Sequence, residues 1–239
     1  MDAINLSKRL ACVAKFIPKG ARLADIGSDH AYLPAHLLLN QKIDFAIAGE
    51  VALGPLQNAQ AEIKNAELTK QLEPRLGDGF AVIKPNDHID TVVIAGMGGQ
   101  LIQKILAEGH REHHQYEKLI LQPNTDTAMV RTWLQNNQYA LVDETMLFDD
   151  GHYYEVLVAQ PGITSFTEQQ ITFGPFNLQH QTLTWKQRWQ SELNRLNQLL
   201  ITLFQAKQGN SIAYQEYQNQ AQQIKEVLGN ASEKTNSSD

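Results

Sequence analysis

A short apolar run near the N-terminus ends in a cluster of polar side chains that could do chemistry. The run covers residues 22–26, and the chain continues through Gly27, Ser28, Asp29 and His30 into an apolar segment of helical character. Such a strand–loop–helix is typical of nucleotide-binding α/β units, in which backbone N–H groups and a helix N-terminus face the ligand. We therefore expect a ligand at this loop. A turn with incidental polar residues is the alternative.

The negative charge of this loop favours a cationic ligand over a pyrophosphate. Gly27 is its only glycine, whereas the dinucleotide fingerprint G-x-G-x-x-G needs three. The carboxylates of Asp25 and Asp29 would repel a pyrophosphate but not a cation. S-adenosylmethionine carries a sulfonium and an amino group, so the loop suits a ligand of that kind.

A third acid ends the second predicted strand. Residues 43–48 form a buried type of strand, and Gly49 and Glu50 follow it. A carboxylate at this place commonly accepts hydrogen bonds from two ribose hydroxyls. Glu50 therefore supports a nucleoside ligand without naming it, and an ordinary surface acid is the alternative.

The third predicted strand, residues 72–76, also leads into an acid. Asp78 stands between two glycines, and Phe80 follows. The Asp78 carboxylate could accept a hydrogen bond from an adenine amino group while Phe80 packs on or near the ring. A simple Asp-Gly turn is the alternative.

The clearest strand is residues 90–95, which runs into the glycine-rich segment 96–99. Glycines allow the backbone to approach a ligand closely or to make a tight turn. Ligands of parallel sheets lie at the carboxyl ends of the strands, so we expect the floor of a pocket here.

The order of the remaining elements predicts the fold class. A fifth strand at 118–121 precedes a helix at 125–137, which Thr125 is expected to cap. Residues 139–148 and 152–159 then form an antiparallel hairpin around an Asp-Gly turn. Five alternating strand–helix units that end in such a hairpin are not expected of a purely parallel dinucleotide fold.

The composition changes to Gln, Asn, Leu and Trp from residue 177 onward. Apolar residues step by three and four along two segments, which predicts two helices paired as an antiparallel hairpin. The apolar positions are Trp185, Trp189, Leu193, Leu196, Leu200 and Leu203, then Tyr217, Ala221, Ile224 and Leu228. We expect a first domain over residues 1–161, a helical domain over 162–230 and a disordered tail over 231–239.

The N-terminal segment is basic, although the whole chain has a net charge of −6. Apolar residues at helical spacing predict an amphipathic helix from about residue 6 to residue 17, capped by Ser7 or Asn5. The basic side chains of residues 1–22 are Lys8, Arg9, Lys15, Lys19 and Arg22. Such a face can bind phosphates, and a solvated helix face is the alternative.

Composition excludes several classes of protein. With 239 residues, 42% of them apolar, the chain can bury a substantial core. Cys12 is the only cysteine, so no internal disulfide is possible, and we see neither a secretion signal nor a membrane span. We expect a cytoplasmic protein. His110, His113 and His114 lack the ligand spacing of a closed metal site, so we expect no metal.

Several motifs together resemble a known family, the bacterial tRNA (adenine-N1)-methyltransferases called TrmK, which modify adenine 22. The resemblance covers about residues 5–228. The motifs that carry it are Asp25–Pro34, Ala48–Glu50, Gly77–Gly79, Ile94–Gly99, Leu121–Asn124, Leu6–Leu10, Tyr154–Ala159 and Phe173–Phe176. It implies a class I S-adenosylmethionine-dependent methyltransferase fold, Rossmann-like, with a mostly parallel seven-stranded sheet and a C-terminal helical hairpin or coiled coil.

The resemblance also implies roles for individual residues. Asp25, Gly27 and Ser28 would line the methionine end of S-adenosylmethionine, and Glu50 and Val51 the ribose. Asp78 and Gly79 would bind the adenine of the cofactor. The residues expected to form the floor are Ala95, Gly96 and Met97.

For the tRNA, the resemblance implies that one adenine leaves its stack and enters the site. Its N1 offers an in-plane lone pair, so no deprotonation is needed before methyl transfer. Asp29 is expected to accept a hydrogen bond from the N6 amino group, with His30 as its orienting partner. Alternatively, Asp29 contacts only the amino group of the methyl donor.

The remaining tRNA contacts are expected from exposed cations and from groups near the pocket. Tyr32, Met97 or Asn124 would receive the base. The expected phosphate contacts are Lys8, Arg9, Lys15 and Lys19. We expect no membrane contact and favour a monomer.

Other functions remain open at this point. A small-molecule methyltransferase on the same scaffold would show no salt-dependent affinity for tRNA. A nicotinamide-dependent oxidoreductase is disfavoured by the missing glycines and the terminal hairpin. A non-catalytic RNA-binding module is disfavoured by the acids Asp25, Glu50 and Asp78.

Overall fold

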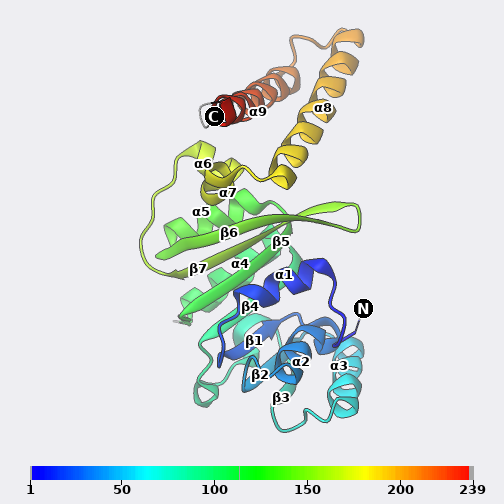
Figure 1. The fold of residues 1–239 in the computed structure, drawn as a ribbon, viewed down its shortest axis with the longest axis vertical. Helices are drawn as coiled ribbons and strands as arrows, with labels where there is room; N and C mark the ends of the chain where they lie inside the picture. The colour runs from blue at the N-terminus through cyan, green and yellow to red at the C-terminus, as the bar shows by residue number, and fades with distance from the viewer. Residues whose placement is uncertain (1, 113, 237–239) are drawn as a thin grey trace. The chain divides into compact units, whose positions relative to one another are not determined.

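The apolar runs that predict strands form one sheet in the first part of the chain. The computed structural model describes residues 2–112 and 114–236, and the chain divides into two units, Met1–Phe176 and Asn177–Asp239 (Figure 1). The first unit contains the sheet and the second contains two long helices.

The sheet has seven strands in the order β3-β2-β1-β4-β5-β7-β6. The strands are β1 (Arg22–Ile26), β2 (Phe45–Glu50), β3 (Leu72–Leu76), β4 (Thr91–Gly98), β5 (Lys118–Thr125), β6 (Tyr139–Asp149) and β7 (His152–Pro161). Strands β1 to β5 run parallel to their neighbours, whereas β7 pairs antiparallel with both β5 and β6. This topology confirms the predicted α/β fold with a terminal hairpin.

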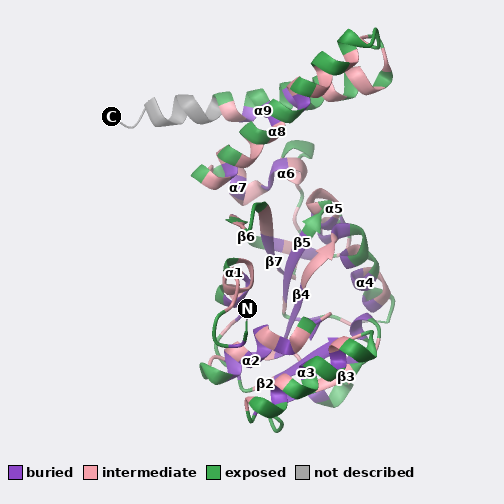
Figure 2. Cartoon of the chain, turned by 90° about the vertical axis from the view of Figure 1, so that its right-hand side faces the viewer, coloured by how far each residue is buried: buried purple, intermediate pink, exposed green. Residues whose placement is uncertain are grey.

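Helices cover both faces of the sheet and create two hydrophobic cores. One face carries α1 (Lys8–Phe16), α2 (Tyr32–Leu39) and α3 (Leu53–Asn65). The other face carries α4 (Gly99–Arg111) and α5 (Thr127–Asn136), which lie opposite α1 and α2 in Figure 2. Burial on both faces explains why the central strands are almost entirely apolar. It also holds the ends of these strands in fixed positions.

Helix α1 follows from its sequence pattern as predicted. The Ser7 side chain caps it by accepting a hydrogen bond from the Leu10 N–H at 3.2 Å. Val13 and Ala14 are buried against the sheet, while Lys8 and Lys15 stay exposed. The helix therefore presents an apolar face to the core and cations to solvent.

The predicted start of α5 is wrong by two residues. Strand β5 continues to Thr125, which pairs with Gly98 of β4, so Thr125 cannot cap the helix. Asp126 precedes the helix at a φ of 57°, and the Thr125 hydroxyl donates to its carboxylate instead. Pairing with the neighbouring strand thus outweighs the local capping preference of threonine.

A buried ion cluster joins α5 to the terminal hairpin. Arg131 donates to one carboxylate oxygen of Glu144 through Nε and Nη2, at 2.9 and 2.8 Å, and Nη2 also donates to Glu155. Arg131 Nη1 binds the Ile171 carbonyl at 3.1 Å, and the Phe176 N–H donates to Glu144 at 2.9 Å. The cluster therefore fastens the segment that follows the sheet.

The first unit ends at Phe176, later than the sequence predicts. The sequence predicts a break after residue 161, whereas residues 162–176 belong to the first unit. That segment contains the short helix α6 (Glu168–Phe173), and helix α7 (Pro175–His180) spans the division between the units. The sequence analysis assigns neither helix. Pro161 and Gly162 mark only the end of β7.

The second unit is the predicted helical hairpin. It pairs α8 (Leu183–Gln205) with α9 (Ile212–Asn236), and the Thr182 hydroxyl caps α8. The buried positions of these two helices include Trp185, Leu193, Leu196, Ala221 and Ile224. Helix α9 runs through residues 231–236, where the sequence predicts a disordered tail, and residues 237–239 lie outside the described part of the chain. Within the described residues, no helix combines the length and hydropathy needed to cross a membrane.

We expect Arg131→Met to lower the free energy of unfolding by about 3–5 kcal/mol, since it removes the positive charge that offsets the buried carboxylate of Glu144 and the partly buried one of Glu155. Urea unfolding of the full chain measures this change. The matched control is Lys104→Gln in the exposed Lys104–Glu108 pair, whose charges lie 3.8 Å apart; we expect a change below about 0.5 kcal/mol there. Equal effects of the two substitutions would contradict the assigned role of the cluster.

Candidate active site

The predicted site residues follow the carboxyl ends of four adjacent strands. In the sheet order β3-β2-β1-β4 these strands are all parallel, so their carboxyl ends lie at one edge. Asp25 lies at the end of β1, Glu50 ends β2, Asp78 follows β3, and Met97 lies near the end of β4. Ligands of open α/β sheets bind at such an edge, beside the point where the strand order reverses.

Backbone hydrogen bonds hold the loop after β1 against β2. The N–H groups of Gly27 and Ser28 both donate to the Gly49 carbonyl, each at 2.9 Å. Gly27 has a φ of 73°, a conformation that glycine adopts without cost. The Ser28 hydroxyl turns back and donates to the Asp25 carboxylate at 2.5 Å.

Asp25 is the buried charge of the site. It is 6% exposed, and this burial raises the pKa of its carboxyl to about 6. The hydrogen bond from Ser28 and the positive charge of Arg9 lower this pKa, while the charge of Glu50 raises it. A cation bound beside Asp25 would favour its ionised form, so the carboxyl is suited to a positively charged ligand.

The next residues form an exposed polar group with a strained backbone. Asp29 and His30 lie in the single turn η1 (Asp29–Ala31), and His30 and Ala31 have φ values of 58° and 54°. Left-handed conformations of residues with side chains cost about 1 kcal/mol or more each and cluster at functional sites. The His30 ring stacks on Tyr32 with centroids 5.0 Å apart, and its Nε2 lies 3.4 Å from Asp29 Oδ1. The structure thus brings these three predicted residues together.

The loop at the end of β4 packs directly over the loop at the end of β1. A Cβ atom at Gly27 would collide with the terminal methyl of Met97, so the Met97 side chain covers this glycine. Gly96 precedes Met97 with a φ of 81°. The two loops therefore restrain each other at the centre of the sheet edge.

The Gln122 side chain links Arg9, Gly96 and Asn124 by hydrogen bonds, a role that is not predicted from the sequence. It is 0% exposed, and its Oε1 accepts from the Gly96 N–H at 3.1 Å and from Arg9 Nη1 at 2.6 Å. Its Nε2 donates to the Pro123 carbonyl and to Asn124 Oδ1. A glutamine directly after the apolar run Leu119–Leu121 is the sequence signal that points to such a network, because a buried amide needs partners.

Two further predicted residues, Arg9 and Asn124, lie beside Gln122 and Gly96. Arg9 is half-buried and bound to Gln122, unlike the exposed Lys8, Lys15 and Lys19. Asn124 is exposed, and its Nδ2 donates to the Gly96 carbonyl at 2.8 Å.

Glu50 lies at the edge of the site with its carboxylate turned toward the following backbone. Its Oε2 accepts from the N–H groups of Val51 and Ala52 at 3.0 and 3.4 Å. The Val51 side chain is 66% exposed. The expected ribose contact and its apolar neighbour are therefore both open to a ligand.

The prediction that Phe80 packs on a bound base is wrong. Phe80 is 5% exposed, and its ring lies where a Cβ at Gly109 of α4 would stand. It also meets the Tyr116 ring edge-on, with centroids 5.3 Å apart. The aromatic side chain thus belongs to the core, while Asp78 is exposed and Gly79 is buried beside Ile105.

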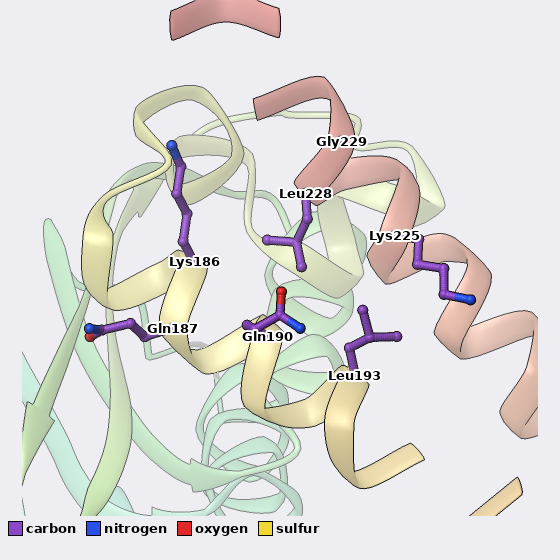
Figure 3. Close-up of a pocket in the computed structure, with 7 residues that line it drawn as sticks. All are labelled: Lys186, Gln187, Gln190, Leu193, Lys225, Leu228 and Gly229. Atoms are coloured by element: carbon purple, nitrogen blue, oxygen red, sulfur yellow. The ribbon is translucent and has the colours of Figure 1, made fainter. Parts of the chain in front are cut away.

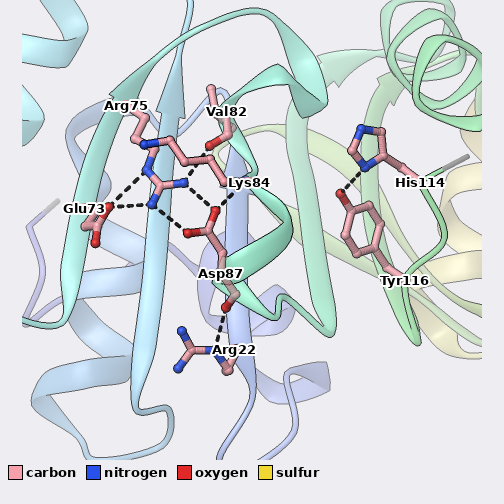
Figure 4. Close-up of polar contacts among 8 residues, drawn as sticks. All are labelled: Arg22, Glu73, Arg75, Val82, Lys84, Asp87, His114 and Tyr116. Atoms are coloured by element: carbon pink, nitrogen blue, oxygen red, sulfur yellow. Dashed lines mark hydrogen bonds and ion pairs between the residues drawn. The ribbon is translucent and has the colours of Figure 1, made fainter. Parts of the chain in front are cut away.

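An ion pair fixes the segment that follows Asp78 (Figure 4). Arg75 of β3 donates to both carboxylate oxygens of Asp87 at 2.5 and 2.9 Å, and to the Val82 carbonyl at 2.8 Å. These hydrogen bonds hold the pKa of Asp87 below its usual value. The Val82 side chain fills the space that Cβ atoms at Gly49 and Gly77 would occupy. The loop that carries Asp78 is therefore held against β2 and β3.

The helical unit has a hollow of its own between α8 and α9 (Figure 3). Its volume is about 500 Å³. It is lined by Lys186, Gln187, Gln190, Leu193, Lys225, Leu228 and Gly229. Two lysines are the charged residues among these seven, and the two glutamines are polar but neutral.

The structure offers no metal centre in the described part of the chain, where no three His, Cys, Asp or Glu side chains are grouped suitably. His110 meets Trp133 edge-on, and His114 stacks on Tyr116. His113, which the sequence analysis groups with them, lies outside the described residues.

Comparisons with known proteins agree with one another. A family model described as tRNA (adenine(22)-N(1))-methyltransferase, TrmK, matches residues 23–233. The curated tRNA (adenine(22)-N(1))-methyltransferase of Bacillus subtilis is 39% identical over 236 residues, which are 95% of this chain and 99% of that protein.

Solved structures give the same result. The crystal structure of a putative tRNA methyltransferase of Streptococcus pneumoniae matches with a TM-score of 0.89 and 39% identity, over 94% of this chain and 100% of that one. The same protein in complex with S-adenosyl-L-methionine matches with a TM-score of 0.86 and 38% identity, over 94% and 100% of the two chains. Since the family model and these relatives span nearly the whole chain, it belongs to the TrmK family of tRNA (adenine(22)-N(1))-methyltransferases.

Proposed function

We propose that this protein methylates N1 of adenine 22 in tRNA, with S-adenosylmethionine as the methyl donor, and that the strand-end residues described above form its active site. The activity is the one that defines the family. The observation that carries the site assignment is the buried carboxylate of Asp25 at the end of the central strand β1, whose pKa of about 6 suits a cationic ligand. A cytoplasmic location, as the sequence predicts, agrees with tRNA as the substrate.

We assign the cofactor contacts by the order of the strand ends. Asp25, Gly27 and Ser28 would hold the methionine end, and Glu50 and Val51 the ribose. Asp78 and Gly79 would hold the adenine, and Ala95, Gly96 and Met97 would form the floor. The arrangement supports this assignment because the four segments lie in the spatial order β3-β2-β1-β4, which matches adenine, ribose and methionine in sequence along one molecule.

The protein groups around the target base would act by position and charge. S-adenosylmethionine supplies the methyl group, and adenine N1 needs no base because its lone pair is already free. The ring becomes cationic during transfer, so a nearby carboxylate stabilises it. Asp29, with its 73% exposed side chain beside His30, is placed for this role. The alternative role for Asp29, a contact to the amino group of the donor, uses the same carboxylate.

The end of β4 favours a ring nitrogen as the acceptor. Methyltransferases that act on exocyclic amines typically carry an Asp/Asn-Pro-Pro-aromatic sequence there, whereas this chain has Ala95–Gly98. Tyr32, Met97 or Asn124 is the proposed contact for the extruded base.

The tRNA backbone would meet cations outside the pocket. Lys8 and Lys15 lie exposed on α1, and Lys19 lies exposed just after it. Lys186 and Lys225 line the hollow of the helical unit. Phosphate contacts of this kind position a nucleic acid without reading its sequence.

The central experiment is transfer of labelled methyl groups to unmodified tRNA transcripts, with primer extension to map the product. We expect a stop at adenine 22, because a methyl group on N1 blocks base pairing. Asp29→Asn should lower kcat by about tenfold to a hundredfold through loss of the carboxylate charge. Transfer to N6 would contradict the assigned acceptor. A fully active Asp29→Asn variant would contradict the role of Asp29.

The affinity for S-adenosylmethionine should depend on pH through Asp25. The cation binds the ionised carboxylate, so affinity measured by calorimetry should be constant above about pH 7 and fall by up to about tenfold per pH unit below about 6. Asp25→Asn should bind weakly and without this pH dependence. A pH-dependent Asp25→Asn variant would show that another group titrates.

The same raised pKa makes a prediction for stability without ligand. The folded carboxyl titrates at about 6 and the unfolded one near 3.8, so its contribution is fully present below about pH 4 and is lost as the pH rises to about 6. Asp25→Asn should therefore stabilise the ligand-free protein at pH 7 by up to about 3 kcal/mol and have little effect at pH 4. Urea unfolding at the two pH values measures the difference.

The affinity for tRNA should decrease with salt concentration if these lysines contact phosphates. Each phosphate contact contributes up to about 0.9 to the slope of log affinity against log salt concentration. We expect the double variant Lys8→Gln/Lys15→Gln to reduce this slope by about 1–2. An equal reduction in Lys186→Gln/Lys225→Gln would indicate that the helical unit also binds RNA. A wild-type enzyme with no salt-dependent affinity for tRNA would instead indicate a small-molecule substrate.

A further inference from the structure

Arg9 differs from the lysines beside it on α1 in being turned toward the sheet edge. It is half-buried, and its Nη1 donates to the buried Gln122 side chain at 2.6 Å. Its guanidinium lies over the Tyr154 ring of β7, 5.6 Å from the centroid. The backbone N–H of Arg9 donates to Asp149 of β6 at 2.9 Å. Contacts from β5 and β7 therefore fix this side chain, and a hydrogen bond to β6 fixes its backbone.

Gln122 uses all of its hydrogen-bonding groups in this arrangement. Its Oε1 accepts from Arg9 and from the Gly96 N–H, and its Nε2 donates to the Pro123 carbonyl and to Asn124. Because Gln122 is 0% exposed, no solvent molecule at the surface can replace a lost partner without rearrangement. Arg9 thus determines how the Gln122 amide is oriented.

The network ends on both backbone groups of Gly96. The N–H of Gly96 binds Gln122 at 3.1 Å, and its carbonyl accepts from Asn124 at 2.8 Å. A Cβ at Gly96 would stand 3.1 Å from Arg9 Nη1, so the guanidinium lies directly against this loop. Gly96 separates Ala95 from Met97, the proposed floor of the cofactor site.

We propose that Arg9 is a positioning residue for methyl transfer, which holds the Ala95–Met97 loop in place through Gln122, and that it does not contact tRNA phosphate. This inference rests on the proposed function and replaces the role that the sequence predicts for Arg9. Helix α1 then serves two purposes: its exposed lysines face solvent, and its arginine shapes the floor of the site.

The first test compares kinetics with tRNA affinity. Arg9→Gln should lower kcat by about tenfold or more, while the salt slope of tRNA binding stays at the wild-type value. Lys8→Gln should reduce that slope by about 1, and Lys104→Gln on α4 should change neither quantity. If Arg9→Gln proves poorly folded by thermal unfolding, Arg9→Lys replaces it, since it keeps the charge but cannot reproduce the planar guanidinium.

The second test asks whether Arg9 acts through Gln122. Gln122→Leu removes the amide, and in that background Arg9→Gln should lower kcat by less than about twofold, because residues that act as a unit are not additive. A full additional tenfold loss would place the action of Arg9 elsewhere.

The third test needs neither ligand nor activity. Amide hydrogen exchange of the segment 95–98 in the ligand-free chain should be at least about tenfold faster in Arg9→Gln than in the wild type, since the Gly96 N–H loses its oriented acceptor. Unchanged exchange, or a reduced salt slope with wild-type kcat, would overturn the inference. A wild-type enzyme that fails to methylate tRNA would overturn the proposed function instead, and the exchange measurement would still decide the role of Arg9.

Discussion

The burial of one carboxylate at the end of a central parallel strand is the constraint on which the site depends. Asp25 lies near the end of β1, between β2 and β4, and it is only 6% exposed, so its carboxylate is desolvated. The Ser28 hydroxyl and the Arg9 charge offset part of this cost, since both lower the pKa of Asp25, but the pKa still reaches about 6. A cationic ligand at this edge relieves a cost that the ligand-free fold carries.

The rest of the edge is built by side chains that fill the space beside glycines of neighbouring loops. Met97 covers Gly27, and Val82 lies against both Gly49 and Gly77. The Met97–Gly27 and Val82–Gly49 contacts each join segments of different strands, so these segments restrain one another. This mutual restraint matters for methyl transfer, because an acceptor nitrogen that needs no deprotonation leaves alignment as the main source of rate.

Local patterns were sufficient to predict the strands, the terminal hairpin and the helical hairpin, because period and turn residues reflect short-range physics. They failed where contacts between distant segments decide. Thr125 joins β5 because Gly98 of β4 pairs with it. Phe80 packs in the core because Gly109 has no side chain and leaves room for its ring.

At the site too, contacts between distant segments could not be predicted from the sequence, as Arg9 shows. Its position in a basic, amphipathic segment indicates a phosphate contact, and only the fold reveals a buried amide 113 residues away as its partner. The positions of Asp25, Glu50 and Asp78 in the fold could be predicted from sequence because each lies at or just after the end of its own strand. For Gln122 the sequence indicates only an amide that needs partners, since the identity of those partners depends on which segments lie beside β5.

Methyl transfer conserves the positive charge. The two carboxylates near the loop after β1 differ in exposure, and hence in how strongly each interacts with that charge. The positive charge begins on the donor and ends on the adenine ring. Asp25 is buried, so its interaction with a cation is strong, whereas the Asp29 side chain is 73% exposed and its interaction is weakened by solvent. A site with only the buried carboxylate would favour the donor over the product. In the proposed site, Asp29 at the surface would give the charge a partner after the transfer as well, and the methylated base would leave from a carboxylate that solvent already screens.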